Sequence, residues 1–251
     1  MIFSITETNM KKTLMMASSI FILFILWQVI YMIVNHPLLV PSIGSVFGAF
    51  ADILTHLDSL KVIGFTLFRL FLSIILSGIL GISIGILAGL NQKLSFFIKP
   101  YVTILRTIPV ISIVVILLII FGYAYTPFII TFLMVFPIIF QSVHEGIIHI
   151  DHELIDVYRL EEKHLFLAIK ILYFPMVKNH IILGLLQSFG LGLKVLVMAE
   201  YLSQTRISIG NAIYLSKINL QYDLVFAWTL ILILIATLLE YAIKKYESAK
   251  K

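Results

Sequence analysis

Three charged residues, Arg69, Lys194 and Glu200, lie inside long apolar segments of the chain. A charge at membrane depth costs on the order of several kcal/mol unless it is paired or hydrated, so each is a candidate functional residue. Glu200 can form an ion pair with Arg69 or with Lys194 inside a helix bundle. The cations can instead attract an anion to a transport path, or extend their long side chains to the membrane surface. The sequence leaves these alternatives open.

Four histidines and several carboxylates lie close together between residues 144 and 164. His149 and His152 are three residues apart, so they would share one face of a helix and could bind a metal. The cluster lacks a closed set of ligands, and we assign no metal site. It also lacks a Ser-His-Asp arrangement or a convincing carboxylate pair, so we assign no catalytic residue.

Acidic residues concentrate in DHELIDVYRLEEKHLFLAIKILYFPMV, residues 151–177. Apolar residues such as Leu154, Val157 and Tyr158 recur there at three- and four-residue steps, which predicts helix. We therefore expect an amphipathic helix pair that Pro175 closes. Such a pair between membrane spans can bind a soluble partner, and it indicates a transporter subunit that is driven from outside the membrane.

The composition indicates the kind of helices that position these residues. The chain is 61% hydrophobic and 12% charged, with a mean hydropathy of +1.08, which excludes a soluble domain. One crossing of the bilayer takes about 20 apolar residues. We therefore predict a single all-α transmembrane domain over residues 1–251, with six spans at 13–34, 61–90, 100–121, 127–148, 179–202 and 223–243. Residues 10–27 are similar to a signal peptide, but the apolar run continues to Val34, so we interpret them as an uncleaved first span.

The basic residues predict the orientation of these spans. Thirteen of them lie at the termini and in the 91–106 and 149–178 regions, against three (Lys61, Arg206 and Lys217) on the other side. This bias places both termini and the 149–178 loop in the cytoplasm. Residues 35–60 and 203–222 are then external, and we expect Gly210 to break the second of these segments. The net charge of +5 follows from the same bias, and no patch of basic and aromatic residues indicates nucleic-acid binding.

Several motifs can be compared with a known family. One family has the signature E-A-A-x(3)-G-x(9)-I-x-L-P, where x is any residue. The acidic segment has the same spacing, with Asp156-Val157-Tyr158 at E-A-A, Glu162 at the glycine, Leu172 at the isoleucine and Phe174-Pro175 at L-P. Further stretches are TLFRLFLSIILSGILGISIGILAGL (66–90), IKPYVTILRTIPVISI (98–113) and LGLKVLVMAEYL (191–202). Together they resemble the inner-membrane permease subunits of binding-protein-dependent ABC importers, in the sulfonate, nitrate and taurine branch.

This resemblance implies a six-span, type I ABC importer permease in a bacterial cytoplasmic (inner) membrane. Two permease subunits would line a path, here as a homodimer surrounded by membrane lipid. A cytoplasmic ABC ATPase would bind the coupling segment, and an extracytoplasmic binding protein would deliver the solute. ATP would be used by the ATPase, with no cofactor bound to this chain, which lacks a G-x-x-x-x-G-K-[ST] phosphate loop. The coupling residues that the resemblance implies are Glu153, Leu154, Asp156, Val157, Tyr158, Glu162 and Pro175.

Glu162 departs from the family pattern, which has glycine at this position to allow a turn. Glutamate favours helix, so either the turn is made with helical or bridging angles or the segment is one kinked helix. Two other functions also stay open. An integral membrane enzyme would need a catalytic cluster, for which residues 144–164 are the candidate, whereas a channel or secondary transporter would work without an ATPase. The branch suggests small organic anions or vitamin-precursor-like solutes and does not name one.

Overall fold

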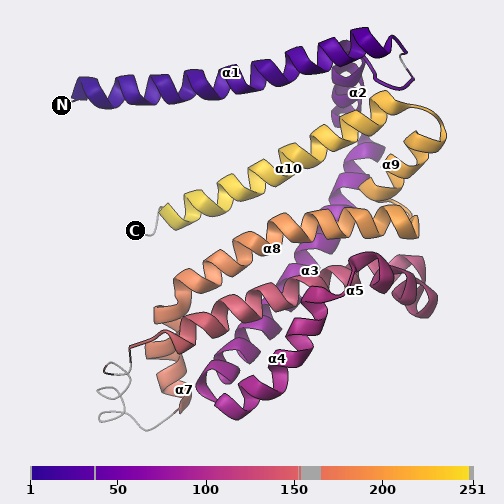
Figure 1. The fold of residues 1–251 in the computed structure, drawn as a ribbon. Helices are drawn as coiled ribbons and strands as arrows, with labels where there is room; N and C mark the ends of the chain where they lie inside the picture. The colour runs from indigo at the N-terminus through magenta and orange to yellow at the C-terminus, as the bar shows by residue number, and fades with distance from the viewer. Residues whose placement is uncertain (1, 37, 152, 154–164, 249–251) are drawn as a thin grey trace.

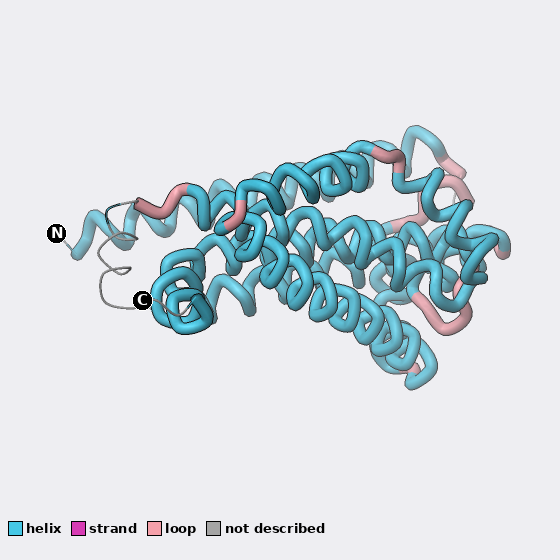
Figure 2. Tube along the Cα trace, turned by 90° about the horizontal axis from the view of Figure 1, so that it is seen from below, coloured by secondary structure: helices cyan, strands magenta, loops and turns pink. Residues whose placement is uncertain are grey.

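The computed structural model describes residues 2–36, 38–151, 153 and 165–248, and in this part of the chain the regular structure is helical, without strands (Figures 1 and 2). Among these described residues, four segments are long and apolar enough to cross a membrane, namely Leu57–Leu90, Val110–Ile148, Ile169–Ser203 and Tyr222–Ile243. The predicted all-α class is therefore confirmed for the described residues. The helices are α1 (Ile2–Val34), α2 (Ile43–Thr55), α3 (Leu57–Leu90), α4 (Gln92–Thr107), α5 (Val110–Ile148), α7 (Leu165–Ala168), the π-helical turn η1 (Ile169–Tyr173), α8 (Phe174–Ser203), α9 (Ile209–Ile218) and α10 (Tyr222–Ser248).

The core forms where α5 packs against α3 on one side and α8 on the other. A small residue every four positions on α3 permits this close approach, because little side-chain volume separates the two backbones. The hydroxyls of Ser73 and Ser77 donate hydrogen bonds to the carbonyl oxygens of Phe128 and Phe132, each at 3.2 Å. Gly81, Gly85 and Gly89 then lie against Ile139, Val143 and Ile147.

The segment 100–121, predicted as one continuous span, is divided between two helices. α4 ends at Thr107, and Ile108 adopts an extended conformation (φ −65°, ψ 131°) before α5 begins. Pro109 explains the break, because a residue that precedes proline is driven out of the helical region. Ile108 and Pro109 therefore separate a short, basic α4 from an apolar α5.

α5 itself bends at Gly122, whose dihedral angles (φ 70°, ψ 178°) are non-helical and are allowed essentially to glycine alone. Val114 and Leu117 before the bend share a hydrophobic cluster with Ile130 and Met134 after it. In a straight helix Val114 and Ile130 would be about 24 Å apart, so the two parts fold back on each other. The predicted span 127–148 lies within the second part, which begins upstream of residue 127.

Pro175 does not close a helix, in contrast to the sequence prediction. Tyr173 and Phe174 on its N-terminal side have helical dihedral angles, and Pro175 lies in the first turn of α8. Proline has no N–H to continue the helical hydrogen-bond ladder, and helical conformation is nevertheless kept on both sides of it. The wider π-helical turn η1 directly precedes it, so the chain runs from α7 through η1 into α8 as one helical rod.

The remaining helices pack around this core. α2 begins at its N-cap Ser42, whose hydroxyl accepts a hydrogen bond from the N–H of Ser45 at 3.1 Å. α2 packs on α10, and α9 packs between α8 and α10. α1 touches this layer through the stacked rings of Phe24 and Phe47. In both views, α1 begins and α10 ends on the side where α5 ends (Figures 1 and 2).

Candidate functional site

Glu200 lies near the end of α8 with its side chain fully buried. An ionised carboxylate in this position needs a partner, because burial removes the water that would solvate its charge. Arg69 of α3 is that partner: its Nη1 lies 3.0 Å from Oε1 of Glu200 and donates a hydrogen bond. The Arg69 side chain is itself 18% exposed. Of the two cations that the sequence offered for Glu200, the structure brings Arg69 to it.

Thr66 adds a second contact to the same carboxylate. Its hydroxyl lies 3.0 Å from Oε2 of Glu200 and donates to it, and its oxygen accepts a hydrogen bond from the backbone N–H of Ile209 at 3.0 Å. Sequence reasoning did not single out this residue. The available signal was its spacing, since Thr66 and Arg69 are three residues apart and share one face of α3.

Gly210 lies inside the first turn of α9 and does not break the segment, so that prediction was wrong. Its backbone N–H donates to Oε2 of Glu200 at 3.3 Å. A Cβ at this position would lie 2.4 Å from the backbone nitrogen of Tyr201 and 2.5 Å from the carbonyl oxygen of Val197. Glycine is therefore required by the close approach of α9 to α8, and the carboxylate of Glu200 links α3, α8 and α9.

Arg69 also holds the turn that connects α8 to α9. Its guanidinium donates to the carbonyl oxygens of Ile207 at 3.1 Å and Arg206 at 3.3 Å. Gln204 and Ile207 both have a backbone φ of 51°, a left-handed conformation that residues other than glycine rarely adopt. Such strained residues persist where the surrounding contacts fix them, and Arg69 supplies such a contact at Ile207.

The same turn is attached to α5. Thr205 donates from its hydroxyl to the carbonyl oxygen of Tyr123 at 2.6 Å, and its Oγ1 lies 2.6 Å from Oγ of Ser203. Tyr123 follows Gly122, where α5 folds back. The turn after α8 and the bend in α5 therefore lie together at one end of the bundle.

Lys194 has a different environment from the other two charged residues. Its side chain is exposed on α8, on a face with Gln187, Leu191 and Met198, and it forms no hydrogen bond or ion pair with the residues that the structure describes. It is nine residues before Ser203, or about 13 Å along the helix. An exposed ammonium group at this depth is unfavourable against lipid, so this face needs water or another protein surface.

Five of the sequence-predicted coupling residues lie outside the described residues: Leu154, Asp156, Val157, Tyr158 and Glu162. Glu153 is exposed, and its backbone N–H donates to Oδ1 of Asp151 at 3.0 Å. Pro175 is exposed in the first turn of α8. The structure therefore places the two attachments of the acidic segment, after α5 and before α8. His149, considered above as a metal ligand, has its Nδ1 at 2.7 Å from the carbonyl oxygen of Glu145.

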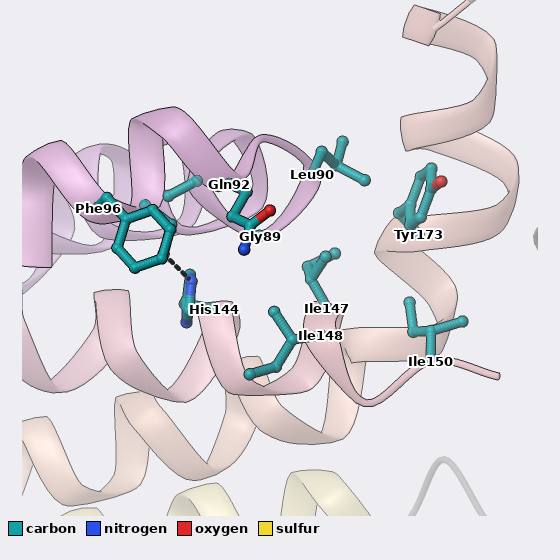
Figure 3. A pocket seen from close by; sticks show the side chains of 11 residues that line it. Gly89, Leu90, Gln92, Phe96, His144, Ile147, Ile148, Ile150 and Tyr173 are labelled. Carbon is teal, nitrogen blue, oxygen red and sulfur yellow. Dashed lines mark hydrogen bonds between the residues drawn. The ribbon is translucent and has the colours of Figure 1, made fainter. Parts of the chain in front are cut away.

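A cavity of about 620 Å³ lies beside these attachments, where α3 ends, α4 begins and α5 ends (Figure 3). Within it, Nε2 of His144 is hydrogen-bonded to Oγ of Ser95 at 2.8 Å. A second cavity of about 250 Å³ adjoins it and shares Ser95, His144 and Ile148 with it. The larger cavity is lined by Ala88, Gly89, Leu90, Gln92, Ser95, Phe96, His144, Ile147, Ile148, Ile150 and Tyr173.

Comparison with known proteins connects this arrangement to a family. The chain is 24% identical over 228 residues to the putative aliphatic sulfonates transport permease protein SsuC of Bacillus subtilis (strain 168). The aligned region covers 90% of this chain and 82% of that protein. A family model described as "Binding-protein-dependent transport system inner membrane component" matches residues 81–249. This range includes Glu200, Lys194 and both cavities. The chain therefore belongs to the family of inner-membrane components of binding-protein-dependent transport systems, as its sequence motifs indicated.

Proposed function

We propose that this chain is the permease subunit of an ATP-driven ABC importer, in which two copies line one path for a small solute. An extracytoplasmic binding protein delivers the solute, and a separate cytoplasmic ATPase uses the ATP. Family membership supports this proposal in general terms. The attachment of the acidic segment to the core supports the ATP-driven mechanism.

The acidic segment connects the two helices that pack against each other most extensively in the core. It follows α5, which ends at Ile148, and returns through α7 and η1 into α8. A soluble partner that moves this segment therefore moves two core helices as well, and this is the arrangement that an ATPase needs to change the state of the path. The carboxylates around Asp156 and Glu162 suit a basic-rimmed groove on the ATPase, which would guide the encounter and fix its register.

Lys194 suggests what the path carries. Its exposed ammonium group needs a polar surrounding at membrane depth, which a water-filled path between two copies of α8 would provide. A cation in that position attracts anions. The related Bacillus subtilis protein is named for aliphatic sulfonates, which are anions, and a small organic anion is therefore the solute class that we propose.

Six crossings are compatible with the described helices if two of them are irregular. α4 and the first part of α5 would cross together as one broken helix, and the second part of α5 would return. Broken helices are tolerated in a membrane where protein or water satisfies the freed backbone groups. With α1, α3, α8 and α10 as the other crossings, both termini and the acidic segment lie on the same side, which the basic residues indicate is the cytoplasm.

Tyr158→Asp tests the coupling segment, because a charge in its apolar face should prevent docking on the ATPase. We expect the ATPase to lose copurification with the permease, and ATP-dependent uptake to fall at least tenfold, while the permease stays in the membrane. Glu162→Gly is the matched control in the same segment: it restores the glycine of the family pattern and should leave both readouts unchanged.

The same experiment separates the alternatives. A channel or secondary transporter would carry the solute without the ATPase, and a membrane enzyme would show no uptake in either variant or in the wild-type protein. If Tyr158→Asp leaves copurification and uptake at the wild-type level, the segment does not couple the ATPase to the path.

A further inference from the structure

The two cavities beside His144 form one site with a cationic wall on α4. Ser95, Lys99 and Arg106 are spaced by four and seven residues, so they share the face of α4 that is turned to α5. All three line the smaller cavity, and Ser95 also lines the larger one. Lys99 and Arg106 are about 10 Å apart along the helix axis, which leaves room for a group between them.

The available hydrogen-bond donors in this site suit an anion. The Lys99 ammonium forms no hydrogen bond or ion pair with a described residue, although three N–H donors are present on it. Arg106 donates to Oε1 of Gln141, and the amide nitrogen of Gln141 donates to Oε1 of Glu145 at 2.8 Å. The Arg106 guanidinium has five N–H donors, so this contact leaves others available.

The charge of the lining limits which anion fits. Lys99 and Arg106 contribute two positive charges and Glu145 one negative charge, so with a neutral His144 the smaller cavity has a net charge of about +1. A singly charged anion is balanced by this lining, whereas a doubly charged one would leave an excess negative charge. A phosphodiester, which carries one negative charge, therefore fits better than a free phosphate dianion.

The outer surface of α4 indicates where such a group comes from. Phe96, Phe97, Tyr101 and Ile104 are all more than half exposed on it, and the rings of Phe97 and Tyr101 are 5.6 Å apart. Basic and aromatic side chains are typical of the place where a membrane helix meets the lipid headgroups. α4 begins directly after the long apolar α3 ends, so its first turns lie at the depth of the headgroups.

We propose that the two cavities between α4 and α5 bind a phosphodiester, with its phosphate held by Lys99 and Arg106 and the Ser95–His144 pair beside it. The headgroup of an anionic phospholipid supplies this chemistry at the membrane surface, and a soluble phosphodiester supplies the same chemistry from solution. The larger cavity reaches Ile150, directly before the acidic segment, and Tyr173, near the C-terminal end of that segment (Figure 3). A bound ligand would therefore stabilise the base of that segment.

The experiment compares lipids on the purified full-length permease. Native mass spectrometry counts the lipids that the protein retains from mixtures of equal amounts of dioleoylphosphatidylglycerol and dioleoylphosphatidylcholine. We expect the anionic lipid to be retained at least fivefold over the zwitterionic one. The double variant Lys99→Gln with Arg106→Gln should lose this preference, and Lys99→Arg should keep it. Lys93→Gln is the matched control for the single variant Lys99→Gln, because each removes one positive charge from α4 and Lys93 lines neither cavity.

A soluble arm identifies the source of the ligand. sn-Glycerol 3-phosphoglycerol, which is the phosphatidylglycerol headgroup without acyl chains, is added to permease in phosphatidylcholine nanodiscs, and the thermal unfolding midpoint is measured. A rise that Lys99→Gln removes assigns the site to soluble phosphodiesters, whereas a rise only with the intact anionic lipid assigns it to the membrane. Equal retention of both lipids, together with no shift from the soluble headgroup, would overturn the proposal. It would also be overturned if Lys93→Gln reduced retention as much as Lys99→Gln, because binding would then depend on net charge alone.

Discussion

The two ends of the bundle differ in how their charged groups are surrounded. At the Glu200 end (Glu200, Arg69, Thr66 and the turn 204–208), a fully buried carboxylate has two side-chain partners and a backbone donor, and the turn is held in left-handed conformations. At the His144 end (the two cavities between α4 and α5), about 620 and 250 Å³ of space remain beside exposed cations. The first end is fixed by its own contacts, and the second can accept a ligand or a change of shape.

The largest effect should come from breaking the ion pair at the Glu200 end. Arg69→Gln leaves the buried carboxylate without its cation, and we expect a loss of about 3–5 kcal/mol in stability. Glu200→Gln should cost less, because Arg69 is partly exposed and water can solvate its charge. Thermal unfolding in detergent, followed by the yield of monodisperse protein, measures both.

The double variant Arg69→Gln with Glu200→Gln sharpens this test. Removing both charges eliminates the unpaired group, so the double variant should be more stable than Arg69→Gln alone. A double variant as unstable as the sum of the two single variants would show that the two side chains do not act as a pair.

The second effect concerns the contact between α8 and α9. Gly210→Ala places a methyl group within 2.5 Å of backbone atoms of Val197 and Tyr201, and backbone cannot move aside as a flexible side chain can. We expect a loss of about 1–3 kcal/mol, the usual cost of overpacking. Gly190→Ala on α8, the helix against which α9 packs, is the control, because its Cβ would have open space around it. Equal unfolding midpoints for the two variants would contradict the close approach.

These residues also show how far the sequence could predict the structure. The apolar segments that form α3, α5, α8 and α10 follow from local patterns, and the sequence predicted them. The choice of Arg69 over Lys194 as the partner of Glu200 depends on how α3 packs against α8, which no local pattern determines. The sequence therefore named the charged residues and left their pairing open.

The errors have a common physical cause, which is that glycine and proline have several structural roles. Gly210 was expected to break the external segment 203–222, but it allows α9 to approach α8 closely. Pro175 was expected to end a helix, but the helical conformation continues across it from η1 into α8. In the predicted span 100–121, Pro109 does end α4 by forcing Ile108 into an extended conformation. Only the three-dimensional contacts distinguish these roles.

Thr66→Val tests the second partner of the buried carboxylate. Valine keeps the shape of threonine, so the variant removes the hydroxyl without creating a cavity. It also leaves the N–H of Ile209 without an acceptor. Hydrogen bonds to charged groups contribute about 1.5–3 kcal/mol, so we expect a loss of about 2 kcal/mol in the free energy of unfolding. If Thr66→Val has the stability of the wild-type protein, water replaces the hydroxyl and the Glu200 end is less fixed than its contacts indicate.

The smallest effect should come from Ser95→Ala, the equivalent change at the His144 end. It removes the 2.8 Å hydrogen bond between Oγ of Ser95 and Nε2 of His144. His144 is only partly buried and borders two cavities, so water can take the place of the hydroxyl. We therefore expect a loss of less than about 1 kcal/mol, which is the typical net value of an intramolecular hydrogen bond. Thermal unfolding of Ser95→Ala and Thr66→Val under one set of conditions compares the two ends directly. Should Ser95→Ala be as destabilising as Thr66→Val, the His144 end is as rigidly fixed as the Glu200 end, and the contrast between them is lost.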